Sequence, residues 1–426
     1  MKRKTIFNVI VVMLAAVAIY AAYFLTWGLP EDFPDPYGHA PESSESGTSN
    51  ADLKTTVLKE SSTDSKTSPQ QADSTLPGPQ VEAAVAMFRG DACRTGVYLT
   101  EGVAQNPVIK WTFQSGELLY SSPTVAGDTV YVGSNDHYLY ALARESGAVK
   151  WKFATGSFVR SSPAVWGGLV FFGSADGCLY ALDSGTGEER WRFQAEGGIE
   201  SSPAVVEGTV YFGSFDGNVY ALDSETGEER WRFQTGDMVG SSPSLANGFL
   251  YIGSYDGHLY ALEKDSGTLL WKYKTGNSIY SSPALDGDSV YFGSLDGFFY
   301  AVNAADGSEQ WKFKTAGAIV WSSAAVSDGT VYFGAYDGNL YALDSGSGKQ
   351  KWRFWTGRRS IYASPVLAGG IIYCGGLDGN FYAVDALTGK KRWQIETGQS
   401  IYTSAAVCQG ALYFGNDGGT LYAVSH

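Results

Sequence analysis

The sequence predicts an all-β protein, an eight-bladed β-propeller of four-stranded blades, and three observations support this prediction. Tryptophans recur every forty or forty-one residues, at Trp111, Trp151, Trp191, Trp231, Trp271, Trp311, Trp352 and Trp393. Each interval contains four short strand-like segments, and such units repeated about every forty residues are typical of propeller blades. Glycine (53 residues) and aromatic residues (14%) are abundant, which suits short strands joined by tight turns.

One repeat, from Ser201 to Trp231, shows the expected elements in order. SSPAV, VYFGS and NVYALD are the first three strands, and the segment around residues 231–233 is the fourth. The Asp-Gly pair between the second and third strands predicts a hairpin turn in which both residues have positive φ. Gly227 supplies the turn before the fourth strand.

The two edges of each blade are recognisable from residue type. In the fourth strand Trp231 and Phe233 share one face and Arg232 lies on the other, because side chains alternate along a strand. A charged residue protects an exposed outer edge, whereas the proline of Ser-Ser-Pro suits the other edge, beside the central channel. We expect each repeated tryptophan to bury roughly 150–250 Å² between blades and to have a structural role.

The ring is expected to close through its two ends. Trp111 precedes all eight sets of the first three strands, and the last set, ending at 422–424, lacks a fourth strand. The strand at 108–113 should therefore complete the C-terminal blade.

The N-terminal region predicts a membrane tether. Three basic residues at positions 2–4 precede an apolar run from Val9 to Leu25, extended to Leu29, and about twenty apolar residues span a bilayer. The charge pattern predicts a signal-anchor transmembrane helix at 1–29, with the rest of the chain extracytoplasmic. A cleaved signal peptide is the alternative, since alanines are frequent in the run. Residues 30–80 are polar and should form a disordered linker to the propeller at 81–426.

Composition argues against nucleic-acid and metal binding. The net charge of −14 and the lack of a basic stripe disfavour a phosphate backbone as partner. The four cysteines, Cys93, Cys178, Cys374 and Cys408, form no CxxC pair, and only four histidines are present. Whether the cysteines form disulfides or stay unpaired and buried is open.

The repeat resembles that of the PQQ-like (pyrroloquinoline-quinone) β-propeller family. The family's tryptophan-docking pattern, A-x-D-x-x-T-G-x-x-x-W, is matched at 181–191, 221–231 and 383–393, and 88–96 is similar to the lead-in that often precedes these propellers. The resemblance covers about Val85 to His426 and implies the same fold.

For function, the resemblance leaves two branches. Quinoprotein dehydrogenases hold PQQ and Ca²⁺ with adjacent cysteines, a Glu/Asn/Asp set and an Asp base; this chain has no adjacent cysteines and no long insertions. Compact repeats look more like the non-enzymatic propellers, such as the lipoprotein of the outer-membrane β-barrel assembly machinery, although the lipoprotein cysteine is missing. We therefore expect a binding or scaffolding module with no catalytic residue, cofactor or metal. A PQQ- and calcium-dependent dehydrogenase and a sensor of a small ligand or polysaccharide are the alternatives.

The candidate site consists of positions that do not repeat. The residue before each Ser-Ser pair should enter the channel mouth; around the ring it is Tyr120, Arg160, Glu200, Gly240, Tyr280, Trp321, Tyr362 and Tyr402. The variable hairpin residue on the same face is Asn135, Ala175, Phe215, Tyr255, Leu295, Tyr336, Leu377 and Asn416. Arg358 and Arg359 lie on the rim, and Gly240 leaves a gap.

Exposed Tyr, Trp and Arg favour a protein or peptide partner in the cell envelope. The alternative is that these aromatic residues only fill a narrow channel. The aspartates of the Asp-Gly turns are explained by turn chemistry rather than by calcium; they are Asp136, Asp176, Asp216, Asp256, Asp296, Asp337 and Asp378.

Overall fold

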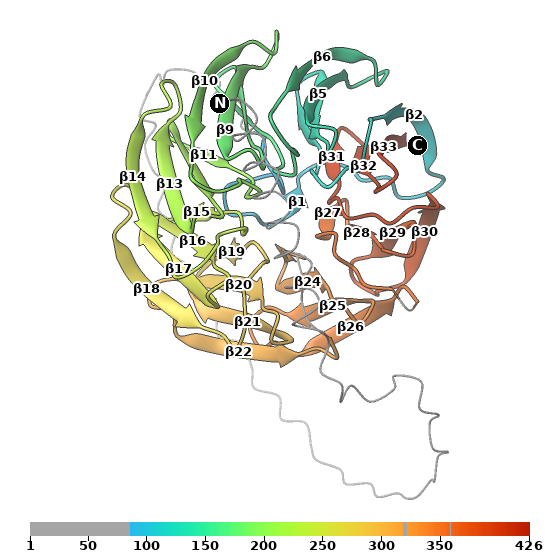
Figure 1. Ribbon diagram of the computed structural model, residues 1–426. Helices are drawn as coiled ribbons and strands as arrows, with labels where there is room; N and C mark the ends of the chain where they lie inside the picture. The colour runs from blue at the N-terminus through green and yellow to red at the C-terminus, as the bar shows by residue number, and fades with distance from the viewer. Residues whose placement is uncertain (1–85, 318–321, 358) are drawn as a thin grey trace, which may run out of the picture. The chain divides into compact units, whose positions relative to one another are not determined.

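The computed structural model describes residues 86–317, 322–357 and 359–426, and these form an eight-bladed all-β propeller (Figure 1). Seven sheets have four strands each, and the seventh blade has a fifth strand, β1. In this part of the chain, no helix is long and apolar enough to cross a membrane. The helix predicted at 1–29 and the linker predicted at 30–80 lie outside the described residues, as do Trp321 and Arg358.

The eight blades repeat the same strand lengths from the channel outward. The innermost strands are β3 (Thr124–Ala126), β7 (Ala164–Trp166), β11 (Ala204–Val206), β15 (Ser244–Ala246), β19 (Ala284–Asp286), β23 (Ala325–Ser327), β27 (Val366–Ala368) and β31 (Ala406–Cys408). The second strands are β4 (Thr129–Gly133), β8 (Leu169–Gly173), β12 (Thr209–Gly213), β16 (Phe249–Gly253), β20 (Ser289–Gly293), β24 (Thr330–Gly334), β28 (Ile371–Gly375) and β32 (Ala411–Gly415).

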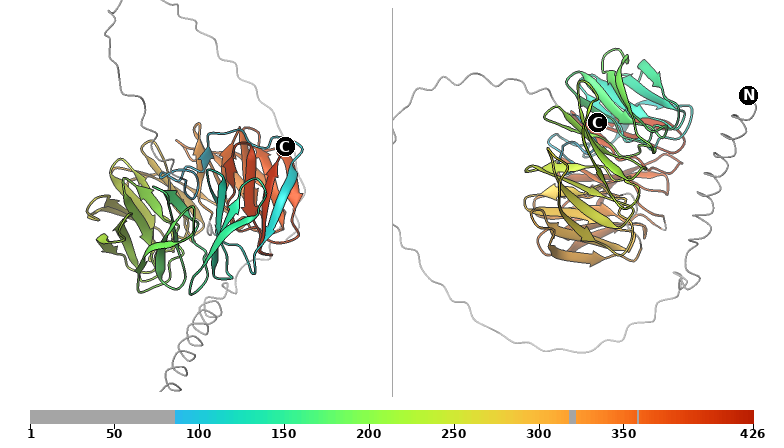
Figure 2. Two further views of the ribbon diagram at one scale, coloured as in Figure 1. Left: turned by 90° about the horizontal axis from the view of Figure 1, so that it is seen from above. Right: turned by 60° about the vertical axis from the view of Figure 1, so that its left-hand side comes forward.

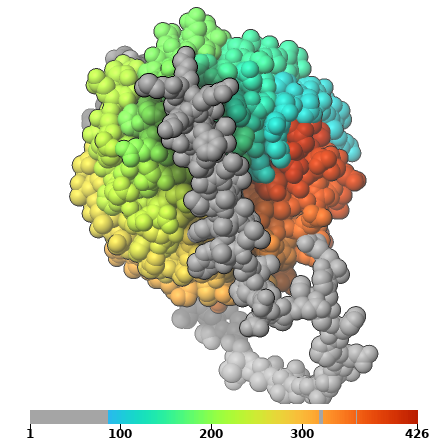
Figure 3. All heavy atoms as spheres, viewed as in Figure 1, coloured from blue at the N-terminus to red at the C-terminus, as the bar shows by residue number. Residues whose placement is uncertain are grey.

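The third strands are buried along their middle residues and partly exposed at one or both ends. They are β5 (Tyr138–Ala143), β9 (Cys178–Asp183), β13 (Asn218–Asp223), β17 (His258–Glu263), β21 (Phe298–Asn303), β25 (Asn339–Asp344), β29 (Asn380–Asp385) and β33 (Thr420–Ser425). The outermost strands are β6 (Val149–Ala154), β10 (Glu189–Gln194), β14 (Glu229–Gln234), β18 (Leu269–Lys274), β22 (Glu309–Lys314), β26 (Gln350–Trp355), β30 (Lys391–Glu396) and β2 (Val108–Gln114). Figure 2 shows the blades as twisted sheets, and successive blades touch along the visible rim in Figure 3.

Ring closure is confirmed. β2 pairs with β33, with Val108 opposite Ser425, and so supplies the outermost strand of the eighth blade. The tryptophans contact the neighbouring blade: all eight indole N–H groups donate to a backbone carbonyl, at 2.7–3.2 Å. Trp393 donates to the carbonyl of Val103, so a second contact joins the seventh blade to the segment that precedes β2.

Two local predictions were wrong. Ser-Ser-Pro precedes the innermost strand instead of belonging to it, so β11 begins at Ala204. In the Asp-Gly turns only the glycine has positive φ, as at Gly217 (85°), and its N–H donates to the carbonyl of Ser214 at 3.0 Å. The Asp accepts hydrogen bonds with its side chain, so it needs no left-handed backbone.

The four cysteines are unpaired.

Candidate functional site

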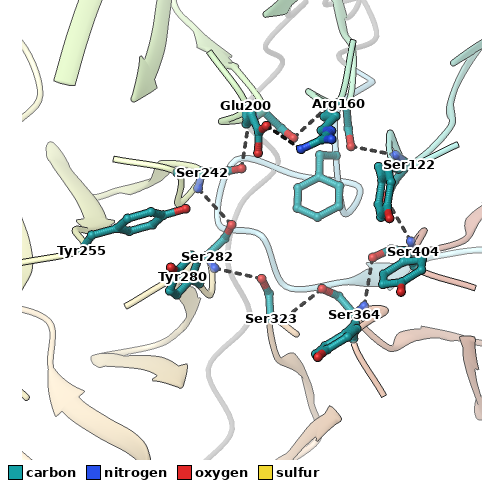
Figure 4. A pocket seen from close by; sticks show the side chains of 17 residues that line it. Ser122, Arg160, Glu200, Ser242, Tyr255, Tyr280, Ser282, Ser323, Ser364 and Ser404 are labelled. Atoms are coloured by element: carbon teal, nitrogen blue, oxygen red, sulfur yellow. Dashed lines mark hydrogen bonds and ion pairs between the residues drawn. The ribbon is translucent and has the colours of Figure 1, made fainter. Parts of the chain in front are cut away.

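A closed ring of serine hydrogen bonds surrounds the channel at the level where the innermost strands begin. The backbone N–H of each second serine donates to the hydroxyl of its counterpart in the next blade, at 2.9–3.1 Å, and Ser404 returns to Ser122. The ring consists of Ser122, Ser162, Ser202, Ser242, Ser282, Ser323, Ser364 and Ser404, six of which are labelled in Figure 4. Sequence reasoning missed it, although the repeated Ser-Ser-Pro was the signal.

Residues 86–98, which we call the N-terminal plug, occupy the channel on the other side of the ring. Innermost strands expose the N–H of their central residue toward the channel, and five of these groups donate to plug carbonyls. The pairs are Val165 with Ala86, Leu245 with Ala92, Leu285 with Cys93, Val326 with Thr95, and Leu367 with Gly96. β1 (Val97–Tyr98) then pairs in parallel with β27. The plug therefore blocks the channel.

Two buried arginines fix the plug. Arg94 donates to the carbonyls of Pro243 (2.9 Å), Phe88 (2.7 Å) and Ser202 (2.8 Å), and Arg89 reaches those of the sixth blade. Burial lowers the pKa of Arg94 to about 9 and that of Arg89 to about 10. Both side chains serve as multiple donors to main-chain oxygens, which stabilises the plug against several blades at once.

The predicted mouth residues do come together, around a cup of about 110 Å³. The cup is lined by the serine ring, by Phe88 of the plug, by Tyr255, and by Tyr120, Arg160, Glu200, Gly240, Tyr280, Tyr362 and Tyr402. The remaining predicted member, Trp321, lies outside the described residues. All seven described mouth residues are half-buried, so each combines packing with an accessible surface.

The predicted pair of opposed charges is an ion pair. Arg160 Nη1 lies 2.9 Å from Glu200 Oε1, and the side chains are 24% and 15% exposed (Figure 4). The guanidinium also lies 5.2 Å from the ring centre of Tyr120. Burial raises the pKa of Glu200, and the opposing effect of Arg160 is smaller. The pair therefore places a poorly hydrated carboxylate and a cation on one side of the cup.

The other side of the cup is an arc of tyrosines. Tyr120 and Tyr402 have ring centres 4.7 Å apart, Tyr402 stacks on Tyr362 at 5.6 Å, and Tyr362 lies 6.2 Å from Tyr336. Tyr336 is 47% exposed, and burial raises the pKa of Tyr362 to about 12. The arc therefore extends the aromatic surface from the cup to the outside of the sixth blade.

The gap predicted at Gly240 is filled. Tyr255, from the hairpin of the same blade, packs with its ring centre 4.0 Å from that of Tyr280. A Cβ at position 240 would lie 2.6 Å from the Tyr255 hydroxyl. A larger residue at position 240 would therefore require the Tyr255 side chain to move, a contact that the spacing of the repeat does not reveal.

The variable residue of the eighth hairpin was also assigned wrongly. Asn416 accepts hydrogen bonds from the N–H groups of Gly418 (3.1 Å) and Thr420 (3.0 Å), so it shapes the turn and is buried. Asp417 takes the variable position instead. Burial raises the pKa of Asp417, and its Oδ1 is buried without a hydrogen-bond partner among the described residues.

The aspartates of the Asp-Gly turns accept hydrogen bonds within the turn and from the preceding blade. Asp216 accepts hydrogen bonds from the N–H of Asn218 (2.8 Å), the hydroxyl of Tyr220 (2.8 Å) and the N–H of Glu196 in the preceding blade (3.1 Å). These carboxylates therefore also connect neighbouring blades. The described residues contain no group of three or more His, Cys, Asp or Glu side chains arranged to hold a metal ion.

The described mouth does not fit PQQ and calcium. Pockets for small molecules and cofactors span roughly 300–1,000 Å³, whereas the cup measures about 110 Å³. Within the described lining Glu200 is the single carboxylate, and it already pairs with Arg160. A calcium ion needs six to eight oxygen ligands, several of them carboxylates in known sites. The described lining therefore does not offer the donor set of that cofactor.

Comparisons with known proteins agree with this architecture. The family model described as outer membrane protein assembly factor BamB matches residues 109–238 and 215–426. No curated protein matches the chain. Among solved structures, BamB from Moraxella catarrhalis is 18% identical (TM-score 0.65), with 75% of this chain and all of that one covered.

Two other similar structures show that the fold serves unlike purposes. The computationally designed Ika8 protein is 19% identical (TM-score 0.67; 77% of this chain, 100% of that one). Quinohemoprotein alcohol dehydrogenase from Comamonas testosteroni is 17% identical (TM-score 0.70; 80% of each chain). At these identities the likeness shows the fold alone. The family match spans both halves of the ring, and the chain therefore belongs to the PQQ-like β-propeller family described as outer membrane protein assembly factor BamB.

Proposed function

We propose that this protein is an extracytoplasmic, membrane-tethered scaffold whose propeller binds a partner protein or peptide at the mouth. The tether is the apolar segment at 1–29, with residues 30–80 as linker. The likeness to a BamB family fits a propeller that works through protein contacts. In this proposal the chain carries no catalytic residue and needs no cofactor.

The shape and chemistry of the cup support this proposal most. The serine ring and the plug close it from below, so it is shallow and has room for one or two partner side chains. Half-exposed tyrosines and the Arg160–Glu200 pair surround it. Tyr, Trp and Arg in partly enclosed positions are the residue types that dominate binding energy in protein interfaces. A docked aromatic or basic side chain would stack on Tyr402 and Tyr362.

The test is site-specific photo-crosslinking of the full-length chain in its own membrane. Replacing Tyr362 by p-benzoylphenylalanine should yield a discrete protein adduct. Leu387, which is 87% exposed on a turn away from the cup, is the matched control and should yield none. The double variant Arg160→Glu/Glu200→Arg keeps an ion pair but reverses its direction, so the adduct should disappear while the melting temperature stays unchanged.

Two results would overturn the proposal. One is an equal loss of adduct and of melting temperature in the double variant, which would make the pair purely structural. The other is stoichiometric binding of PQQ with Ca²⁺, accompanied by dye reduction with alcohols or sugars, which would favour a dehydrogenase.

A further inference from the structure

The outermost strand of the sixth blade, β26, differs in charge from its counterparts. Residues 345–360 contain five Lys or Arg and no Asp or Glu. The corresponding stretch of the third blade, 224–239, contains two Arg and four Asp or Glu. Because the whole chain carries a net charge of −14, this stretch is a local basic segment on an acidic protein.

The repeat shows how the basic surface arises. In β14, Arg232 Nε lies 2.9 Å from Glu229 Oε1, and in β10 Arg192 pairs with Glu189 at 3.3 Å. The residue in the position of Glu229 is Gln350 in β26, so Arg353 loses its carboxylate. Among the described residues Arg353 forms no ion pair, and neither does Lys349, just before the strand, or Arg359, in the loop that follows it.

An exposed tryptophan accompanies the free cations. Trp355 occupies the position of Gln234 and is 60% exposed. It lies on the same face of β26 as the exposed Arg353, since alternate residues of a strand share a face. Charges alone would protect a free edge from association, but a large exposed ring favours it. Trp and Arg together are typical of interface hot spots.

The backbone of β26 is available for pairing. The sheet order is β23-β24-β25-β26, so β26 is an edge strand at the rim of the ring (Figure 1). In the described part of the chain no strand pairs with its outer edge. A free edge can receive an extended segment as an additional strand, with side chains of that segment facing Arg353 and Trp355.

We infer that β26 docks an acidic, extended segment of a partner protein, which adds to the sixth blade as a fifth strand. Carboxylates of the segment pair with Arg353, Lys349 and Arg359, and an apolar side chain packs on Trp355. Charge complementarity specifies this occupant, because the surface has unpaired cations and the rest of the chain is acidic. None of these four residues lines the cup, so the inference does not rest on the proposed function.

The test uses variants that restore the repeat's own residues and therefore leave the fold intact. The probe is a fluorescein-labelled peptide of alternating Glu and Val, titrated with the detergent-solubilised full-length chain and followed by fluorescence anisotropy. Gln350→Glu should form an ion pair with Arg353, as Glu229 does with Arg232, and weaken peptide binding about two- to fivefold, as expected for one exposed ion pair. Trp355→Gln should weaken binding about tenfold or more, as expected for a hot-spot side chain.

The third blade provides the control. Arg232 in β14 is the counterpart of Arg353 in β26, so Arg232→Glu and Arg353→Glu change the net charge equally. Arg353→Glu should weaken peptide binding, whereas Arg232→Glu should leave it unchanged. Equal weakening by both would show general charge attraction and overturn the inference. So would the absence of saturable peptide binding. Binding of phosphatidylglycerol vesicles in place of the peptide, lost in Trp355→Gln, would also overturn it, because the surface would then recognise a membrane.

Discussion

Replacing Gly227 by alanine should destabilise the propeller by two separable effects. Gly227 has φ +75°, and the left-handed conformation costs a residue with a Cβ about 1–2 kcal/mol. The new Cβ would also lie 2.7 Å from two ring carbons of Trp191, the docking tryptophan of the preceding blade. Overpacking of this kind costs about 1–3 kcal/mol. The expected loss in the free energy of unfolding is therefore about 2–5 kcal/mol.

Gly248 provides a matched control within the same protein. It has φ +82°, but a Cβ there would meet no atom within 4 Å. Gly248→Ala should therefore cost about 1–2 kcal/mol, from backbone conformation alone. Urea unfolding of both variants, followed by tryptophan fluorescence, measures the difference. Equal losses would refute the reasoning, because they would show that the contact with Trp191 adds nothing to the cost of the backbone conformation.

Two further predictions concern the charged groups of the fold. Hydrogen bonds from Arg230 and Thr226 lower the pKa of Asp223 to about 2, below its ordinary value of 3.8. Its stabilising effect is therefore complete above about pH 4 and is lost as the pH falls through 2; Asp223→Asn should reduce the acid sensitivity of the melting temperature in this range. Arg94→Met removes the donor to several buried carbonyls, so the free energy of unfolding should fall by about 2–5 kcal/mol. Limited proteolysis should then cut the plug, and unchanged resistance would argue against its anchoring role.

The architecture was predictable because periodic constraints dominate the sequence. The tryptophan spacing, the alternation in the outermost strands and the unpaired segment at 108–113 all reflect contacts that recur in each blade, and β2 confirms the closure. The hairpin turns were predicted with the wrong backbone geometry. The side chain of Asp216 binds three donors, and this preference is not visible in the Asp-Gly pair itself.

The sequence predicted which residues line the cup better than it predicted the contacts that they make. Counting from each Ser-Ser pair found seven described residues that line one cup. The contacts between blades were missed: the repeated Ser-Ser-Pro marks the positions of the ring, but the repeat does not show that each hydroxyl bonds to the next blade. Asn416 was assigned as the variable hairpin residue in place of Asp417 because both residue types are common in turns. The plug has no repeat, so its path across the channel could not be inferred from periodicity.

The closure by β2 also has a consequence for synthesis in the cell. Val108 is made long before Ser425, its partner in β33. At roughly 5–20 residues per second, translation of the intervening chain takes on the order of tens of seconds. During that time β2 has no partner strand, and the indole of Trp393 can find Val103 only once the seventh blade has emerged. A ribosome that stops before residue 420 therefore releases an open arc with an unpaired edge at each end, so completion of the ring distinguishes full-length products from truncated ones.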